Sequence, residues 1–212
     1  VLVVALVSRT VMPARVLARQ VLAHKLGVFA TNQDADLALL SSTFHTSWSW
    51  RNSSTMKADL NYSPSDIYET LPQPASTVRM KEAGAELDTT RHAIMIDRQL
   101  GLTKLYNMVH DNSVMDQDIQ ALRKIHSSLD ETIAGAYGWT DLDLAHGFHD
   151  TGQGVRFTAD PVARIEILDR LLELNHAQYV HSATRGSHSA KVQSIARNAV
   201  VDSPSENTLF RL

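Results

Sequence analysis

The sequence predicts an α+β protein in three parts: a small mixed α/β portion over residues 1–75, a helical region over residues 76–181 and a flexible C-terminal tail over residues 182–212. Three observations predict this class. Apolar, β-branched runs are confined to the N-terminal end, helical periodicity begins near Ser76, and the composition shifts to Ser, Arg, Asn and Gly after His181. Of the 212 residues, 43% are hydrophobic and 20% charged, which suffices for a sizeable buried core.

The mixed portion begins with two predicted strands, Val1–Val7 and Gln20–Ala30, with a turn or loop at Met12–Ala14 between them. The first strand is the apolar run VLVVALV. No basic segment precedes this run and no small-residue cleavage site follows it, so we expect a buried strand rather than a signal peptide. No run approaches the roughly 18 apolar residues that a membrane span needs, and we expect no membrane partner.

A helix is predicted next over Asp34–Trp50, with Asn32 as a possible N-cap. Its apolar residues recur at helical spacing: Leu37, Leu40, Phe44 and Trp48. The stretch Ser53–Pro74 follows. Within it, Ser63–Asp66 predicts a turn that leads into a short structured piece, and two prolines then interrupt the chain.

The helical region contains four predicted helices, at Ser76–Leu100, Leu102–His110, Asp116–Tyr137 and from Pro161 to about Tyr179. The third has the clearest apolar stripe, formed by Ile119, Leu122, Ile125, Leu129 and Ile133. Gly138 ends this helix, and Trp139 is expected to fold back over the end as a hydrophobic cap. Asp160 is the expected N-cap of the last helix, with a proline in its first turn.

Composition and charge narrow the function classes. The chain has no cysteine, which excludes disulfides and thiolate zinc sites and is compatible with a cytoplasmic protein. The formal net charge is −3, but residues 1–81 hold eight Lys/Arg and five Asp/Glu, so the remaining residues are net acidic. This asymmetry indicates that any contact with a polyanion lies in the first part of the chain.

The segment Trp48–Tyr62 carries residue types that bind phosphate oxygens, by charge or by short neutral donors: Arg51, Ser53, Ser54, Thr55 and Lys57. Lys57, Asp59 and Asn61 alternate, so in an extended segment their side chains leave on the same side. Lysine donates to guanine, asparagine pairs with adenine and aspartate accepts from cytosine, so this row is suited to base edges. The alternative is a polar loop that caps neighbouring helices, which composition alone favours.

Other chemistry has weaker support. His146–His149, even with Asp150, lacks the three or four ligands at fixed spacing that zinc requires. Gly152–Gly154 lacks the third glycine of a phosphate loop and no helix start follows it directly. Asp66 and Glu69 lack the nearby lysine of a nuclease carboxylate site, and no Gly-x-Ser-x-Gly elbow occurs.

Two neighbouring segments carry a family resemblance. Tyr62–Asp66 and Tyr68–Pro74 resemble the signature Y-[ST]-P-[ST] … [FY]-E-T-F-P-x-P of MmeI-like type II restriction–modification enzymes and related phage-defence adenine methyltransferases, in which it closes the target recognition domain. Leu71 stands where the family usually has Phe. Further similar segments extend the resemblance over about residues 1–181: Gly27–Ala30 with Leu37–Ser42, Gly101–Asn107, Ala136–Trp139 and Leu168–Asn175.

The resemblance implies a bacterial DNA-modifying enzyme that transfers a methyl group from S-adenosylmethionine to the exocyclic nitrogen of adenine. The family's Asn-Pro-Pro-Tyr/Phe motif, glycine-rich cofactor loop and nuclease motif do not occur in these 212 residues. The chain also begins with Val, inside an expected strand, which indicates a fragment or a non-ATG start. We therefore expect the recognition and C-terminal portion of such an enzyme, with no cofactor in this chain and no activity alone.

The implied partners are double-stranded DNA and the missing methyltransferase domain, in cis or in trans. The predicted DNA contacts are Arg51, Ser53, Ser54, Thr55, Lys57, Asp59, Asn61, Tyr62 and Ser63. Among them, the row of Lys57, Asp59 and Asn61 is expected to contribute to base choice, and the others to hold the phosphates and the frame. The alternative from another class is a stand-alone helical protein-interaction module without DNA binding.

Overall fold

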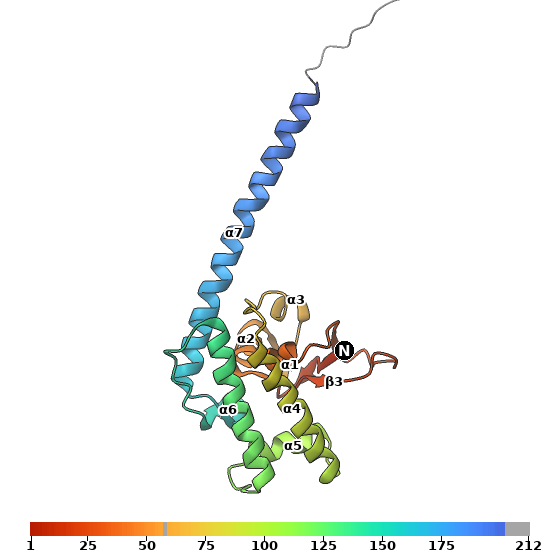
Figure 1. Ribbon diagram of the computed structural model, residues 1–212, viewed down its shortest axis with the longest axis vertical. Helices are drawn as coiled ribbons and strands as arrows, with labels where there is room; N and C mark the ends of the chain where they lie inside the picture. The colour runs from red at the N-terminus through yellow and green to blue at the C-terminus, as the bar shows by residue number, and fades with distance from the viewer. Residues whose placement is uncertain (57–58, 202–212) are drawn as a thin grey trace, which may run out of the picture. The chain divides into compact units, whose positions relative to one another are not determined.

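The computed structural model describes residues 1–56 and 59–201, and the side chains of residues 1–54 and 59–181 (Figure 1). The chain divides into two units, residues 1–172 and 173–212. The α+β class is confirmed, because the chain combines helices with small antiparallel sheets. All features below belong to the first unit, except the part of the last helix after residue 172.

The first sheet holds the predicted N-terminal strands. Its order is β3–β1–β4, with β1 at Leu2–Ala5, β3 at Ala14–Arg15 and β4 at Leu26–Phe29. The central strand β1 is antiparallel to both neighbours and almost entirely buried. The second strand is shorter than predicted, because β1 offers pairing partners only to Leu26–Phe29, and Val21 is fully exposed.

The second sheet contains the polar stretch singled out above. Its order is β2–β6–β5, with β2 at Val7–Ser8, β5 at Ser54–Met56 and β6 at Asp59–Asn61. All pairs are antiparallel, and Leu60 is buried at the centre of β6. The stretch is therefore a β-hairpin added to the end of the N-terminal strand, rather than an irregular loop.

The predicted helix Asp34–Trp50 is two helices, α1 at Asp34–Ser41 and α2 at Thr43–Asn52. Ser42 lies between them in an extended conformation, and its hydroxyl accepts a hydrogen bond from the His45 amide at 3.2 Å, as an N-cap does. The predicted apolar residues are all buried in the core. The N-cap of α1 is Gln33 rather than Asn32, whose side chain accepts a hydrogen bond from Arg15 instead.

The segment with the family-like signature forms a packed frame around α3, at Pro64–Ile67. Tyr62, Ile67 and Leu71 are buried. The Trp48 indole N–H donates to the Ile67 carbonyl at 3.1 Å, and the Tyr137 hydroxyl donates to the Pro72 carbonyl at 2.6 Å. This segment therefore connects the strands to the helices by packing and hydrogen bonding.

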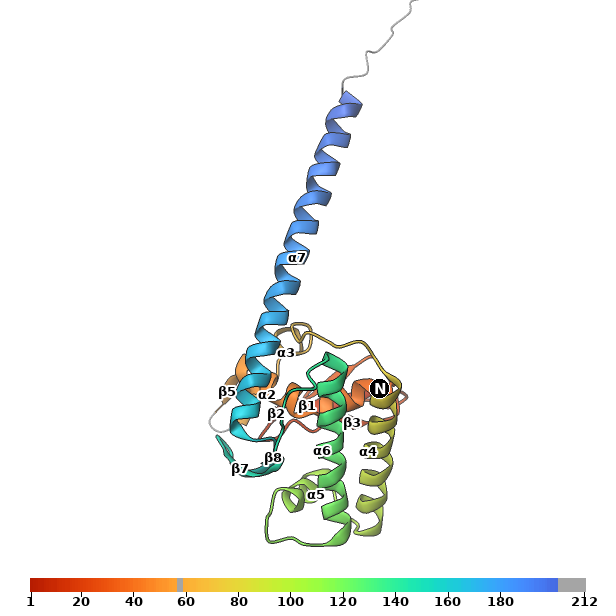
Figure 2. The same cartoon turned by 60° about the vertical axis from the view of Figure 1, so that its left-hand side comes forward.

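Three helices follow close to their predicted ranges: α4 at Val78–Asp97, α5 at Leu102–Val109 and α6 at Gln117–Tyr137. The long helices α4 and α6 lie side by side (Figures 1 and 2). Gly138 ends α6 with φ at 79°, and the Trp139 amide donates to the Ala134 carbonyl at 2.9 Å. The Trp139 ring stacks on Tyr137 at 4.6 Å, so the predicted hydrophobic cap is confirmed.

A second hairpin, which the sequence did not predict, precedes the last helix. Its strands are β7 at Gly147–Thr151 and β8 at Gly154–Thr158. The helix α7 then spans Pro161–Val201, and the predicted N-cap is confirmed because the Asp160 carboxylate accepts from the Val162 amide at 2.8 Å. The helix does not end near Tyr179 as predicted, since no proline interrupts the chain before Pro204.

One continuous hydrophobic core joins the sheets to the helices of the first unit, and it includes residues from before and after position 75. The predicted division of the chain at that position stays a prediction. Of the predicted tail, residues 182–201 continue α7 and residues 202–212 lie outside the described residues. Within the described part of the chain, no helix combines the length and apolar character needed to cross a membrane.

Candidate functional site

The hairpin β5–β6 holds three of the predicted contact side chains at the surface. Asp59 and Asn61 flank the buried Leu60, so both leave the strand on the face opposite to the core, as their alternation predicted. The Asn61 amide donates to the Ser54 hydroxyl at 3.3 Å. The Asp59 carboxylate lies 3.4 Å from the Arg9 guanidinium.

The other predicted contacts are dispersed around this hairpin. Arg51 is exposed near the end of α2, and Ser53 follows that helix as its C-cap. Ser63 precedes α3 and its hydroxyl contacts that of Ser65 at 3.1 Å. The side chains of Thr55 and Lys57 lie outside the described residues.

Tyr62 is not at the surface. Its side chain is 2% exposed, and its hydroxyl bonds to the His45 ring at 2.9 Å. Burial raises the pKa of this hydroxyl well above its usual range. The structure therefore removes Tyr62 from the predicted DNA contacts, because its side chain is used in packing.

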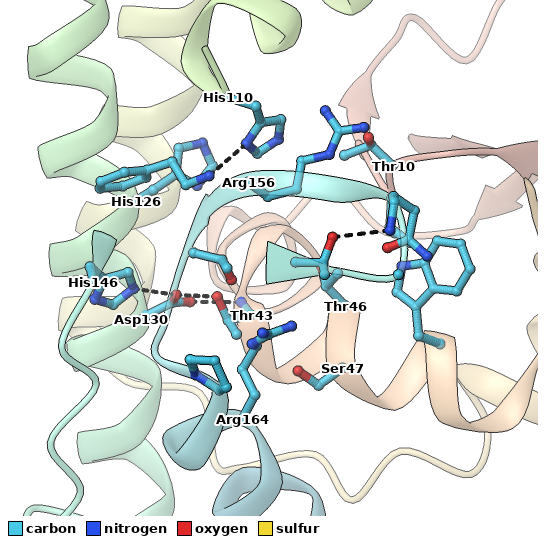
Figure 3. Close-up of a pocket in the computed structure, with 18 of the residues that line it drawn as sticks. Thr10, Thr43, Thr46, Ser47, His110, His126, Asp130, His146, Arg156 and Arg164 are labelled. Atoms are coloured by element: carbon cyan, nitrogen blue, oxygen red, sulfur yellow. Dashed lines mark hydrogen bonds and ion pairs between the residues drawn. The ribbon is translucent and has the colours of Figure 1, made fainter. Parts of the chain in front are cut away.

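A cavity of about 580 Å³ lies next to the hairpin. The elements that line it are the chain after β2, the end of α1, the helices α2, α5 and α6, the β7–β8 hairpin and the start of α7 (Figure 3). A smaller cavity of about 400 Å³ adjoins it, and Arg9, Thr10, Tyr106 and Arg156 line both. Asp59 lines the smaller cavity, so the predicted contact row borders this region.

Four arginines line the larger cavity: Arg9, Arg51, Arg156 and Arg164. Asp130 is the one carboxylate among its lining residues. The cavity is thus a concentration of positive charge in a protein whose formal net charge is −3. Clefts lined by one sign of charge focus the field and attract ions of the opposite sign.

Asp130 is already occupied by hydrogen bonds. Its carboxylate accepts from the Thr43 amide at 2.8 Å and the Thr43 hydroxyl at 2.5 Å, and it contacts His146 Nε2 at 2.8 Å. The residue is 3% exposed. This network ties the start of α2 to α6 and to the segment before β7, and leaves the arginines without a carboxylate partner inside the cavity.

Two of the arginines are partly removed from water. Burial lowers the pKa of Arg156, and the neighbouring charge of Arg9 lowers it further. Burial also lowers the pKa of Arg164, and Asp160 partly offsets this effect. Among the described residues Arg156 forms no ion pair, whereas Arg164 donates to the Asp150 carbonyl at 3.0 Å. Cations held in this way favour binding of an anion, because an anion offsets the cost of their desolvation.

Two histidines of the cavity, His110 and His126, add hydrogen-bonding groups rather than charge. Burial lowers the pKa of His110 to about 3, with smaller contributions from Arg156, His126 and Arg123, and lowers the pKa of His126 to about 4. His110 Nδ1 accepts from the Phe157 amide at 3.2 Å, so the neutral ring carries its proton on Nε2. The His126 ring bonds to the Tyr106 hydroxyl at 2.8 Å. His110 and His126 therefore add no positive charge near pH 7, whereas the four arginines do.

His146 and His149 form hydrogen bonds to other groups of the protein. His146 contacts Asp130, and His149 Nε2 bonds to the Ala145 carbonyl at 3.1 Å. Among the side chains of residues 1–54 and 59–181, no three histidine, aspartate or glutamate residues are grouped as metal ligands would be.

Sequence reasoning missed Arg9, Arg156 and Arg164. Arg156 and Arg164 lie in the net acidic part of the chain, and Arg156 lies on a hairpin that was not predicted. One signal was present in the alternating run Gly154–Thr158, which has strand-like composition and follows a glycine pair. Nothing local in the sequence indicated that this hairpin would face α2.

Comparison of the sequence with family models finds no match, and comparison with curated proteins finds none. Comparison of the fold with solved structures finds a similarity to the Type IIL restriction–modification enzyme MmeI, solved in complex with DNA. The TM-score is 0.55 and the sequence identity is 18%, over 83% of this chain and 21% of that enzyme's chain. The present chain thus has a fold similar to that of part of the enzyme, and spans about a fifth of its length.

Proposed function

We propose that this chain binds double-stranded DNA as the recognition and C-terminal portion of an S-adenosylmethionine-dependent adenine-N6 DNA methyltransferase of a restriction–modification or phage-defence system. The observation that carries the proposal is that four arginines line one cavity. The single carboxylate among the lining residues, that of Asp130, is already hydrogen-bonded. Two further observations support it: the fold similarity to an enzyme solved with DNA, and the family-like signature that packs beside the hairpin.

The arginines are suited to the phosphate backbone. Guanidinium groups bind phosphate oxygens with charge and with paired donors, and such contacts fix the register of a protein on the duplex. Arg51 is exposed and Arg9 is 71% exposed at its side chain, so both can reach a phosphate at the surface. Ser54 adds an exposed short neutral donor at the start of β5, and Thr55 and Lys57 follow it in the sequence.

The exposed side of β6 is suited to base edges. Asp59 and Asn61 leave the strand on one side, and β6 pairs antiparallel with β5 from Ser54 to Met56. A two-stranded ribbon of this kind fits the major groove, where an aspartate accepts from cytosine and an asparagine pairs with adenine. Base choice would thus rest on this strand, and affinity on the arginines around it.

Methyl transfer would take place outside this chain, in the catalytic domain that the proposal assigns as its partner. That domain would hold S-adenosylmethionine and the extruded adenine. The residues of this chain would orient the duplex and exclude wrong sequences, so we expect the 212-residue chain to bind DNA weakly and without methylating it.

Fluorescence anisotropy of a labelled 30-base-pair duplex, titrated with the chain at several salt concentrations, tests the binding. We expect affinity to fall steeply with salt, and Arg51→Gln and Arg156→Gln each to reduce the slope of log K against log salt by about one unit. Arg79→Gln is the matched control, because Arg79 is exposed on α4 outside both cavities. Equal slopes for all three variants would contradict the proposal.

A further inference from the structure

The interior of the 580 Å³ cavity has a composition that a backbone-binding surface alone does not require. Its volume lies within the range of pockets that enclose a small organic ligand. Part of its wall is apolar and aromatic, with Trp50, Phe157 and Leu168 among the lining residues. A phosphate group needs only cations and donors, so this wall indicates a ligand that also has a flat or apolar part.

The polar groups of the interior are grouped on one side. Thr43, Thr46 and Ser47 of α2 are spaced three and four residues apart, so they share one face of the helix. Arg164 is directed into the cavity from α7, on the side that these hydroxyls line (Figure 3). Because the Thr43 hydroxyl already donates to Asp130, the donors available to a phosphate group are the Arg164 guanidinium and the hydroxyls of Thr46 and Ser47.

Three polar atoms around the cavity are shielded from solvent and have no hydrogen-bond partner among the described residues: Ser41 Oγ, His110 Nε2 and Arg164 Nε. Shielded polar atoms are normally hydrogen-bonded in proteins, and each exception calls for an explanation. All three line the same cavity although they belong to three different elements or segments. A ligand that enters this cavity would give each of them a partner.

We propose that this cavity binds one nucleotide, with the phosphate on Arg164 and the hydroxyls of α2, and the base against the aromatic wall beside the Nε2–H of His110. The bound nucleotide can come from two sources. One is a nucleotide that leaves the stack of a bound DNA strand, and for this source the inference rests on the proposed function. The other source is a free nucleotide. Both present the same chemistry, an anionic phosphate linked to an aromatic ring with hydrogen-bond acceptors on its edge.

Calorimetric titration of the full chain tests the shared chemistry with three probes: deoxyadenosine 5′-monophosphate, inorganic phosphate and deoxyadenosine. We expect the monophosphate to bind at least about tenfold more tightly than either of the others, because only it fills both parts of the cavity. Equal affinities for monophosphate and inorganic phosphate would overturn the proposal, because the wall would then contribute nothing.

Substitutions of lining residues test whether the monophosphate binds in this cavity. Arg164→Gln should weaken binding of the monophosphate at least about tenfold, and Arg79→Gln should leave it unchanged. Thr46→Val serves as a second variant with nearly the same shape, in case Arg164→Gln perturbs the fold, and it should weaken binding about three- to tenfold. Unchanged affinity in both Arg164→Gln and Thr46→Val would overturn the proposal.

Two substitutions of His110 test the role of its Nε2–H. His110→Asn keeps an acceptor for the Phe157 amide and removes the donor at the Nε2 position, whereas His110→Gln can return a donor to that position. We expect His110→Asn to weaken binding about tenfold and His110→Gln to recover most of the loss. If the two variants bound the monophosphate equally well, the role of the Nε2–H would be wrong.

A duplex with one unpaired nucleotide distinguishes the two sources. If the ligand is part of a strand, this duplex binds more tightly than a fully paired duplex, and Arg164→Gln removes the difference. If the monophosphate binds and the two duplexes do not differ, the ligand is a free nucleotide. If Arg164→Gln changes neither the affinity for the monophosphate nor that for the duplex with the unpaired nucleotide, the nucleotide site is refuted. If Arg51→Gln still weakens binding of the paired duplex in that case, the proposed DNA binding stands.

Discussion

Arg9 and Asp59 form an ion pair between the chain after β2 and the strand β6, with Arg9 Nε 3.4 Å from Asp59 Oδ1. Their side chains are 71% and 41% exposed, so the pair contributes little to stability and can open at small cost. Arg9 also lines both cavities, whereas Asp59 lines the smaller one. The pair therefore joins the predicted base-contact strand to the arginine cavity as one continuous surface.

Asp59→Asn should raise the affinity of the chain for nonspecific duplex DNA several-fold. The change removes a negative charge beside the interface and frees Arg9 for a phosphate, so the salt slope should also steepen. Anisotropy titrations at two salt concentrations measure both effects. Asp169→Asn, an exposed site on α7 outside the cavities, is the control. A loss of affinity in Asp59→Asn would show that the Arg9–Asp59 pair itself is needed.

Under the proposed function, target choice should depend on β6 when the chain is joined to a catalytic methyltransferase portion. Asn61→Asp and Asp59→Asn exchange an amide and a carboxylate, so they should change which bases are tolerated beside the methylated adenine. Sequencing of methylated positions in a random-sequence plasmid measures this. An unaltered methylation site in both variants would refute base reading by this strand.

Asp130→Asn should destabilise the fold by about 2–4 kcal/mol, because the carboxylate accepts hydrogen bonds from Thr43 and contacts His146 in a nearly dry site. Urea unfolding followed by circular dichroism gives the free energy of unfolding. Asp169→Asn again serves as the control and should stay within about 0.5 kcal/mol of the parent chain. A loss below 1 kcal/mol in Asp130→Asn would mean that the network does not hold α2 against α6.

Gly84→Ala and Gly135→Ala should have opposite effects. A Cβ at Gly84 would lie 1.9 Å from the Asp34 carbonyl oxygen, so α4 and α1 would have to separate, at a cost of about 2–4 kcal/mol. At Gly135, on α6, no atom lies within 4 Å of the added Cβ, and alanine should stabilise the helix by about 0.5–1 kcal/mol. Thermal unfolding of both variants measures the difference, and similar midpoints would contradict the close approach of the two helices.

Stability should fall in mild acid. Burial lowers the pKa of both His45 and His126 to about 4, from the ordinary value of 6.5 for a histidine. The unfolded state therefore binds more protons between about pH 4 and 6.5, so the free energy of unfolding is constant above about pH 6.5 and decreases as pH falls through this window. Each histidine contributes at most about 1.4 kcal/mol per pH unit.

Urea midpoints at pH 7.5, 6.0 and 5.0 measure this dependence. His45 is fully buried, with Nδ1 2.7 Å from the Leu40 carbonyl and Nε2 2.9 Å from the Tyr62 hydroxyl. His45→Gln should be less stable at pH 7.5 and should lose stability less steeply below pH 6.5. The exposed His92 supplies the control, since His92→Gln should leave the pH dependence as it is in the parent chain.

Local pattern was sufficient for much of the fold. Apolar spacing located α4, α5 and α6, and the alternation around Leu60 indicated that Asp59 and Asn61 share a face. The local pattern did not predict structure that depends on residues distant in the sequence. The break between α1 and α2 follows from Ser42 as a cap and from Asp130, which accepts from the Thr43 amide across 87 residues of sequence.

The amino-acid pattern alone predicted the α+β class, the positions of α4, α5 and α6, the absence of cysteine chemistry and the shared face of Asp59 and Asn61 on β6. The packing of distant segments determines that Tyr62 is buried, that β7 and β8 form a hairpin facing α2, and that four arginines from separate parts of the chain line one cavity. The two groups of features depend on interactions over different separations along the sequence. Helical and strand periods depend on neighbours a few residues away, whereas the convergence of charged side chains depends on how completed elements pack against each other.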